Sequence, residues 1–158
     1  MTSDPPTPFT RRRILAATAG ALVFGPGRAQ AAPRDLTVYK TPWCGCCKAW
    51  VAHMARAGFR PKVVEQEDLE PVRRRYAIPF ALSSCHTAVV GGYVVEGHVP
   101  PADVLRLLRE RPRALGLTAP GMPIGSPGME QPGGRTEPFE TLLLLDRAGR
   151  TRRFARHG

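Results

Sequence analysis

Residues 43–48, Trp-Cys-Gly-Cys-Cys-Lys, place three cysteines within four positions. They follow a predicted strand over residues 35–40, where apolar and polar side chains alternate. They open a predicted helix over residues 47–58, because apolar side chains recur on one helical face and Gly58 provides a natural end. This order of strand, thiol-rich turn and helix is the starting point for interpreting the rest of the chain.

Downstream of this unit the pattern predicts further strands and helices in the order β-α-β-α-β-β-α. The predicted strands cover residues 61–65, 87–90 and 93–96, and the predicted helices begin at residues 68 and 101. Strands separated by a helix pair in parallel, whereas strands joined by the Gly91-Gly92 turn pair antiparallel. We therefore expect an α/β fold with a mixed sheet flanked by helices. A Gly/Pro-rich loop over residues 116–134 and a terminal β-hairpin over residues 139–155 extend it.

The N-terminal segment resembles a twin-arginine export signal. Arginines at positions 11–13 precede an apolar run over residues 14–24, which is too short to span a bilayer. Small residues before the predicted cut after Ala31 fit a cleavage site. Residues 1–31 are thus predicted to be the signal and residues 32–158 a periplasmic domain, with an uncleaved anchor or a Sec-type signal as alternatives.

Removing residues 1–31 takes away four arginines and one aspartate and lowers the net charge from +10 to +7. A basic surface can attract nucleic acid or an anionic membrane. The chain has no groove-reading motif, however, and an exported protein rarely meets nucleic acid. We interpret the basic excess as a solvated surface and predict no nucleic-acid partner and no stable membrane span.

All four cysteines lie beyond the signal, and three are adjacent or nearly so. A disulfide within such a cluster closes a tiny loop and adds little stability. The spacing therefore favours a reactive or metal-binding role for these cysteines over structural disulfides. Thiols at a helix N-terminus ionise more easily than free thiols, and thiolates are nucleophiles and soft-metal ligands. Cys44 and Cys47 are three apart and face the same side, whereas Cys46 is rotated by about 100° from Cys47. A third thiolate is surplus to disulfide exchange but useful to a metal.

The element order and residues 43–48 resemble thioredoxin, whose motif is Trp-Cys-Gly-Pro-Cys-Lys; Cys46 stands at the proline position. This resemblance implies a thioredoxin-like sheet in which the segment before the third strand lies against the cysteine-bearing helix end. Thioredoxin-like folds normally hold a cis-proline there, but this chain has Cys85 and His86. The departure counts against ordinary disulfide reductase activity.

The wider pattern resembles the CopG-type family of exported, thioredoxin-like proteins linked to copper resistance. The matching stretches are residues 44–47, 84–89, 92–100 and 121–130. The resemblance implies copper binding by the cysteine cluster and conversion between copper oxidation states.

The predicted metal ligands are Cys44, Cys46, Cys47, Cys85 and His86, with Met122, Met129 and His98 as additional candidates. Thiolates favour Cu(I), Zn(II) or iron–sulfur clusters. Cu(I) is preferred here, because structural zinc sites usually pair two cysteine knuckles and this chain has one. Each additional candidate has an ordinary alternative: gap filling for the methionines and a backbone hydrogen bond at the strand end for His98.

Three functions fit these features. The first is copper handling, with copper ions and other periplasmic copper-handling proteins as partners, and with several Cu(I) ions as an option. The second is a thiol–disulfide oxidoreductase with Cys44 as nucleophile and Cys47 as resolving thiol. The third is a zinc-stabilised module that binds a partner protein.

Overall fold

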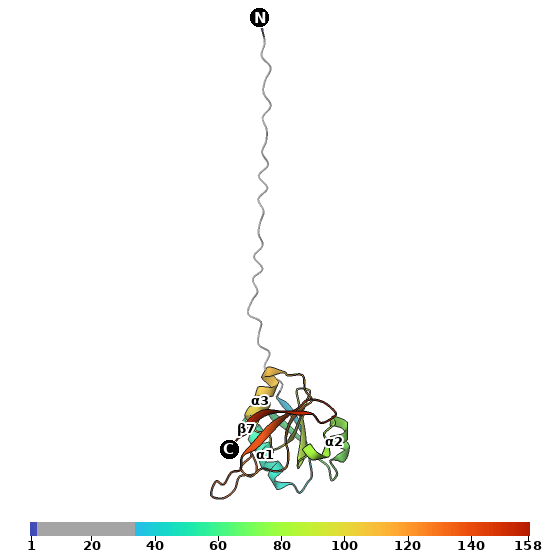
Figure 1. Cartoon of the computed structure of the whole chain (residues 1–158), viewed down its shortest axis with the longest axis vertical. Coiled ribbons are helices and arrows are strands. Elements are labelled where there is room, and N and C mark those ends of the chain that lie inside the picture. The colour runs from blue at the N-terminus through green and yellow to red at the C-terminus, as the bar shows by residue number, and fades with distance from the viewer. Residues whose placement is uncertain (3–33) are drawn as a thin grey trace. The chain divides into compact units, whose positions relative to one another are not determined.

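A computed structural model describes residues 1–2 and 34–158 of the chain (Figure 1). The predicted export signal and its cleavage site fall largely within residues 3–33, outside the described residues. In the described part, the elements are β1 (Asp35–Lys40), α1 (Gly45–Arg56), β2 (Arg60–Glu65), α2 (Glu70–Tyr76), a 3₁₀ turn (Phe80–Leu82), β3 (His86–Val90), β4 (Tyr93–Gly97), α3 (Pro101–Glu110), β5 (Gly116–Ala119), β6 (Phe139–Leu144) and β7 (Thr151–His157). None of the helices in this part is long and apolar enough to cross a membrane.

The strands form one mixed sheet in the order β2-β1-β3-β4-β5-β6-β7. β1 pairs in parallel with β2 and β4 with β5, and the other neighbouring pairs are antiparallel. The predicted mixed α/β fold is thereby confirmed. Because β1 and β3 are antiparallel neighbours, the C-terminal end of β1 lies beside the N-terminal end of β3, where Lys40 pairs with His86. The cysteines that flank these two ends are brought together by this register.

The N-terminus of α1 lies two residues earlier than predicted. The helix begins at Gly45, so that Cys46 and Cys47 occupy its first turn and Cys44 is the N-cap residue. Cys47, Trp50 and Met54 form its buried face, as the helical periodicity predicted for positions 47 and 54. The Trp50 indole donates a hydrogen bond to the carbonyl of Val99, 2.9 Å away, which ties the helix to the segment after β4. The thiol-bearing turn therefore stands on a rigid, packed element.

The prediction of a Gly/Pro-rich loop from residue 116 is wrong over its first four residues. Gly116–Ala119 form β5, a fully buried strand between β4 and β6. Gly116 lies so close to Val94 that a Cβ atom there would overlap the Val94 carbonyl. The glycine thus permits close strand pairing, a use that its sequence context of glycines and prolines concealed.

The terminal hairpin consists of β6 and β7 and reaches His157, two residues beyond the predicted end. His157 Nε2 lies 2.8 Å from Asp103 Oδ2 of α3, which anchors the last strand to a helix. A bulge between Thr141 and Leu142 leaves Phe154 as the extra residue of β7. Arg106 of α3 donates to the freed Phe154 carbonyl at 3.0 Å. The hairpin is therefore fastened to the body of the fold by side chains.

Candidate metal centre

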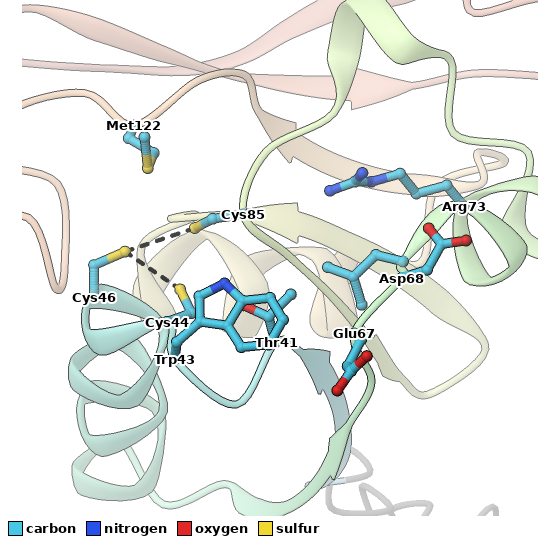
Figure 2. Close-up of a pocket in the computed structure, with 10 residues that line it drawn as sticks. Thr41, Trp43, Cys44, Cys46, Glu67, Asp68, Arg73, Cys85 and Met122 are labelled. Carbon is cyan, nitrogen blue, oxygen red and sulfur yellow. Dashed lines mark hydrogen bonds between the residues drawn. The ribbon is translucent and has the colours of Figure 1, made fainter.

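Four cysteine sulfurs gather where the N-terminus of α1 meets the start of β3. The Sγ atoms of Cys44 and Cys46 are 3.5 Å apart, and those of Cys46 and Cys85 are 3.9 Å apart (Figure 2). The Cys47 sulfur lies 3.5 Å from the backbone carbonyl of Cys85. All four sulfurs lie within 4.8 Å of one another. The structure thus brings Cys85 to the triple-thiol turn, although 38 residues separate it from Cys47.

Two of these cysteines are joined. Cys44 and Cys47 form a disulfide, with Cα atoms 5.4 Å apart, while Cys46 and Cys85 carry free thiols. A bonded sulfur cannot become a thiolate, so this pair must be reduced before all four sulfurs can bind a metal ion. The site therefore combines a disulfide-bonded pair with two free thiols.

The Cys85 thiol is held in its protonated form when no metal is present. Burial raises the pKa of Cys85 to about 12, and the neighbouring Cys46 thiol adds to the rise. A soft metal ion binds the thiolate, so metal binding at this sulfur has to displace a proton. A buried imidazole stands next to it, because His98 Nε2 is 2.9 Å from Cys85 Sγ.

The orientation of His98 follows from its second hydrogen bond. Its Nδ1 lies 2.8 Å from the carbonyl oxygen of Pro127, which can only accept. Nδ1 therefore carries the hydrogen, and Nε2 presents its lone pair towards Cys85. Burial lowers the pKa of His98 and favours this neutral form. The backbone bond expected of His98 and the proximity to the cluster both occur, since its two nitrogens serve different partners.

His86, the residue that follows Cys85 in the chain, is fully buried. Its Nδ1 is 3.5 Å from Cys85 Sγ, and its ring lies 4.3 Å from that of Trp50. Among the described residues its Nε2 has no hydrogen-bond partner. Burial, reinforced by the nearby His98, lowers the pKa of His86 to about 3. Cys85, His86 and His98 form a second group of donors within 4.8 Å of one another, and the Cys85 sulfur belongs to both groups.

The buried His86 predicts acid lability of the metal-free protein. In the unfolded chain its pKa is about 6.5, so between about pH 6.5 and pH 3 the unfolded state binds a proton that the folded state does not. The free energy of unfolding should therefore fall as the pH drops through this window, by up to about 1.4 kcal/mol per pH unit from this group. Urea unfolding of the wild type and of His86→Phe at several pH values tests this. Equal pH dependence in the two proteins would contradict it.

The cluster opens into a cavity of about 410 Å³. Its lining residues are Thr41, Trp43, Cys44, Cys46, Glu67, Asp68, Leu69, Arg73, Cys85 and Met122. Met122 and Trp43 are exposed, with 53% and 69% of their surface open to solvent. Of the two candidate methionines, Met122 lines this cavity beside the thiols (Figure 2), whereas Met129 is not among the lining residues. An ion or a larger ligand can therefore reach the free thiols from solvent.

The segment over residues 121–130 is packed against α1. A Cβ atom on Gly128 would lie 2.7 Å from the Cys46 carbonyl and 2.8 Å from the Trp50 nitrogen, which shows how closely the backbones approach. Glu130 accepts hydrogen bonds from the Gly128 backbone and pairs with His53 Nε2 at 2.6 Å. This docking places the Pro127 carbonyl on His98, a role that the sequence did not reveal.

Sequence reasoning also missed a buried ion pair behind the Cys85 segment. Glu96 of β4 is fully buried, and its Oε1 lies 3.4 Å from Arg73 Nε of α2. A carboxylate within the apolar run of residues 93–97 was the one available signal, because a charged residue in a buried strand requires a partner.

Comparison with known proteins gives a family match and two structural matches. Residues 82–129 match the family described as "Protein of unknown function, DUF411". The solved structure "Copper resistance protein copG- Form 1" is 41% identical, with a TM-score of 0.73, over 79% of this chain and 98% of that one. "Copper resistance protein copG- Form 2" is 40% identical, with a TM-score of 0.74, over 80% and 99%. The comparison with curated proteins gave no match.

Proposed function

The chain belongs to the CopG-type family of copper resistance proteins, and from this premise we propose that it holds Cu(I) in the periplasm as part of copper resistance. The convergence of four cysteine sulfurs within 4.8 Å carries the proposal. Thiolates are soft ligands that suit Cu(I), and a set of four matches the needs of a soft cation better than those of Mg²⁺ or Ca²⁺. The proposed location rests on the signal-like residues 1–31.

In this proposal the ligands are the four thiolates, with the imidazoles of His98 and His86 as nitrogen donors beside Cys85. Because the Cys85 sulfur belongs to both donor groups, it would be available to a Cu(I) ion held by either group. The open cavity beside the thiols, lined in part by Met122, gives other periplasmic copper-handling proteins access for copper exchange. The Pro127 carbonyl holds His98 in the tautomer that a ligand requires.

The proposal is tested by titrating the fully reduced protein, residues 32–158, with Cu(I) under anaerobic conditions against a competing chelator. We expect tight binding of at least one Cu(I) per chain and release of protons, because Cys85 must lose its own. Elemental analysis of the protein as purified distinguishes copper from zinc. Weak Cu(I) binding together with stoichiometric zinc would instead support the zinc-stabilised module.

A redox function is the second candidate, and the Cys44–Cys47 disulfide favours it. The reduced pair can give one electron to each of two Cu(II) ions. Its two sulfurs then form the disulfide, two protons leave, and two Cu(I) ions are produced. The free thiols of Cys46 and Cys85, at 3.9 Å from each other, stay available to receive Cu(I). The same pair would serve thiol–disulfide exchange with a protein substrate.

The substitution Cys46→Ser separates these activities. Cys46 is not part of the disulfide but lies 3.5 Å from Cys44 and 3.9 Å from Cys85. We expect Cu(I) affinity to fall by about 100-fold or more, since outer-shell changes alone cost 10- to 100-fold. The rate at which the reduced protein transfers electrons to a small disulfide should change by less than about threefold, because the Cys44–Cys47 pair is intact. Loss of both activities would contradict the separation.

A further inference from the structure

We infer that Arg73 and Glu96 are positioning residues for Cys85, holding its sulfur close to that of Cys46 so that both can donate to one Cu(I) ion. The inference rests on the proposed copper function. Within the part of the chain that the structure describes, neither residue is hydrogen-bonded to a cysteine sulfur. Both act through the backbone of the segment that carries Cys85, which lies between the 3₁₀ turn and β3.

Glu96 holds the chain on both sides of Cys85. Its Oε1 accepts a hydrogen bond from the backbone nitrogen of Ser84 at 2.7 Å. Its Oε2 accepts one from the Thr87 hydroxyl at 2.6 Å. Cys85 lies between these two residues, so one carboxylate holds the backbone before it and a side chain after it. An ionised carboxylate presents both of its oxygens as acceptors, as these two hydrogen bonds use them.

Arg73 holds the same segment from the side of α2. Its Nη2 donates to the carbonyl of Ser84, and its Nε lies 3.4 Å from Glu96 Oε1. Ser84 is thus held at its nitrogen by Glu96 and at its carbonyl by Arg73. Only 14% of the Arg73 side chain is exposed, so water competes little for these contacts. The peptide that leads into Cys85 therefore has little freedom to move.

The placement of this pair favours a functional role over a purely stabilising one. A buried ion pair usually stabilises a fold no better than an apolar pair of similar size. Here, however, its hydrogen bonds converge on the residues that flank Cys85, the one sulfur shared by both donor groups. Arg73 also lines the cavity into which the thiols open (Figure 2). Outer-shell groups of this kind orient metal ligands and tune their affinity.

The test compares Arg73→Met with Arg74→Met, a matched change at the next, exposed position of the same helix. Anaerobic competition with a chelator measures Cu(I) affinity. We expect Arg73→Met to lower it by about 10- to 100-fold and Arg74→Met to leave it unchanged. Arg73→Lys should recover part of the loss, because it keeps the charge and can donate to Ser84.

A second readout needs no copper. In the metal-free protein with Cys44 and Cys47 bonded, the oxidant diamide removes two electrons and two protons from Cys46 and Cys85 and joins their sulfurs. Because a displacement of about 1 Å can cost up to 100-fold in rate, Arg73→Met should slow this reaction by about tenfold or more. Mass spectrometry of the joined peptides follows it. If Arg73→Met does not fold, Glu96→Gln, which keeps the side-chain size, should shift both readouts in the same direction.

The outcomes separate the two proposals. If the wild type binds Cu(I) and the Arg73 and Arg74 variants behave alike in both readouts, the positioning role is overturned and the copper function stands. If the wild type fails to bind Cu(I) while Arg73→Met still slows formation of the Cys46–Cys85 disulfide, the copper function is overturned and the positioning of Cys85 is supported.

Discussion

Cys85→Ser is expected to lower the affinity of the reduced protein for Cu(I) by more than about 100-fold. A serine hydroxyl is a hard donor that does not replace a thiolate for a soft ion. Cys85 supplies the sulfur common to the two donor groups, so the substitution removes a ligand from both. Outer-shell changes alone cost 10- to 100-fold, and a shared ligand should exceed that range. Anaerobic chelator competition, with copper counted per chain, measures the loss.

The matched control is Ser83→Ala, two positions earlier in the same segment. Its hydroxyl donates only to the Phe80 carbonyl, at 2.7 Å, within the part of the chain that the structure describes. Cu(I) affinity should therefore match the wild type. Wild-type affinity and stoichiometry in Cys85→Ser would mean that the ion is held by the residue 44–47 turn alone.

Gly128→Ala is expected to destabilise the protein by about 2–4 kcal/mol, at the upper end of single-substitution effects. Gly128 has φ of +90°, which strains any residue with a Cβ atom. The new Cβ would also lie 2.7 Å from the Cys46 carbonyl, a backbone atom of α1 that cannot move aside. The segment should lift away and carry the Pro127 carbonyl from His98. Cu(I) affinity should then fall by about tenfold.

Gly133→Ala separates strain from overlap. Gly133 also has a positive φ, +83°, but its added Cβ would meet nothing within 4 Å among the described residues. We expect a loss of only about 1 kcal/mol in urea unfolding and no change in copper affinity. Equal losses for the two glycines would show that backbone strain, and not contact with α1, explains the effect at Gly128.

The sequence predicted those features that depend on local pattern. The first strand, the thiol-bearing helix and the later hairpin have clear apolar periodicity, so their order, the parallel pairing of β1 with β2 and the antiparallel pairing of β3 with β4 were predicted correctly. The rule that strands separated by a helix are parallel was wrong for β2 and β3, which flank α2 and run in opposite directions on either side of β1. The approach of Cys85 to the triple-thiol turn was also predicted, but from the thioredoxin resemblance. Physically it depends on the pairing of β1 with β3, which sets Lys40 opposite His86.

Features that depend on distant contacts were missed. β5 has four residues and no polar alternation, so its burial between β4 and β6 left no periodic signal. The Arg73–Glu96 pair links α2 to β4, and the Pro127 carbonyl meets His98 across 29 residues. The partners in such contacts cannot be identified from a single sequence, because the contacts form only once the sheet and helices are in place.

The donors of the candidate centre come from separate parts of the chain, residues 44–47, residues 85–86 and residue 98. An unfolded chain keeps only the first part together, so it should hold the ion far more weakly than the folded chain does. A ligand that prefers the native state raises stability with its free concentration, by about 2.7 kcal/mol at 100 times its dissociation constant. Resistance to heat and to proteases would then rise with copper supply, and the chain would persist longest where the metal is abundant.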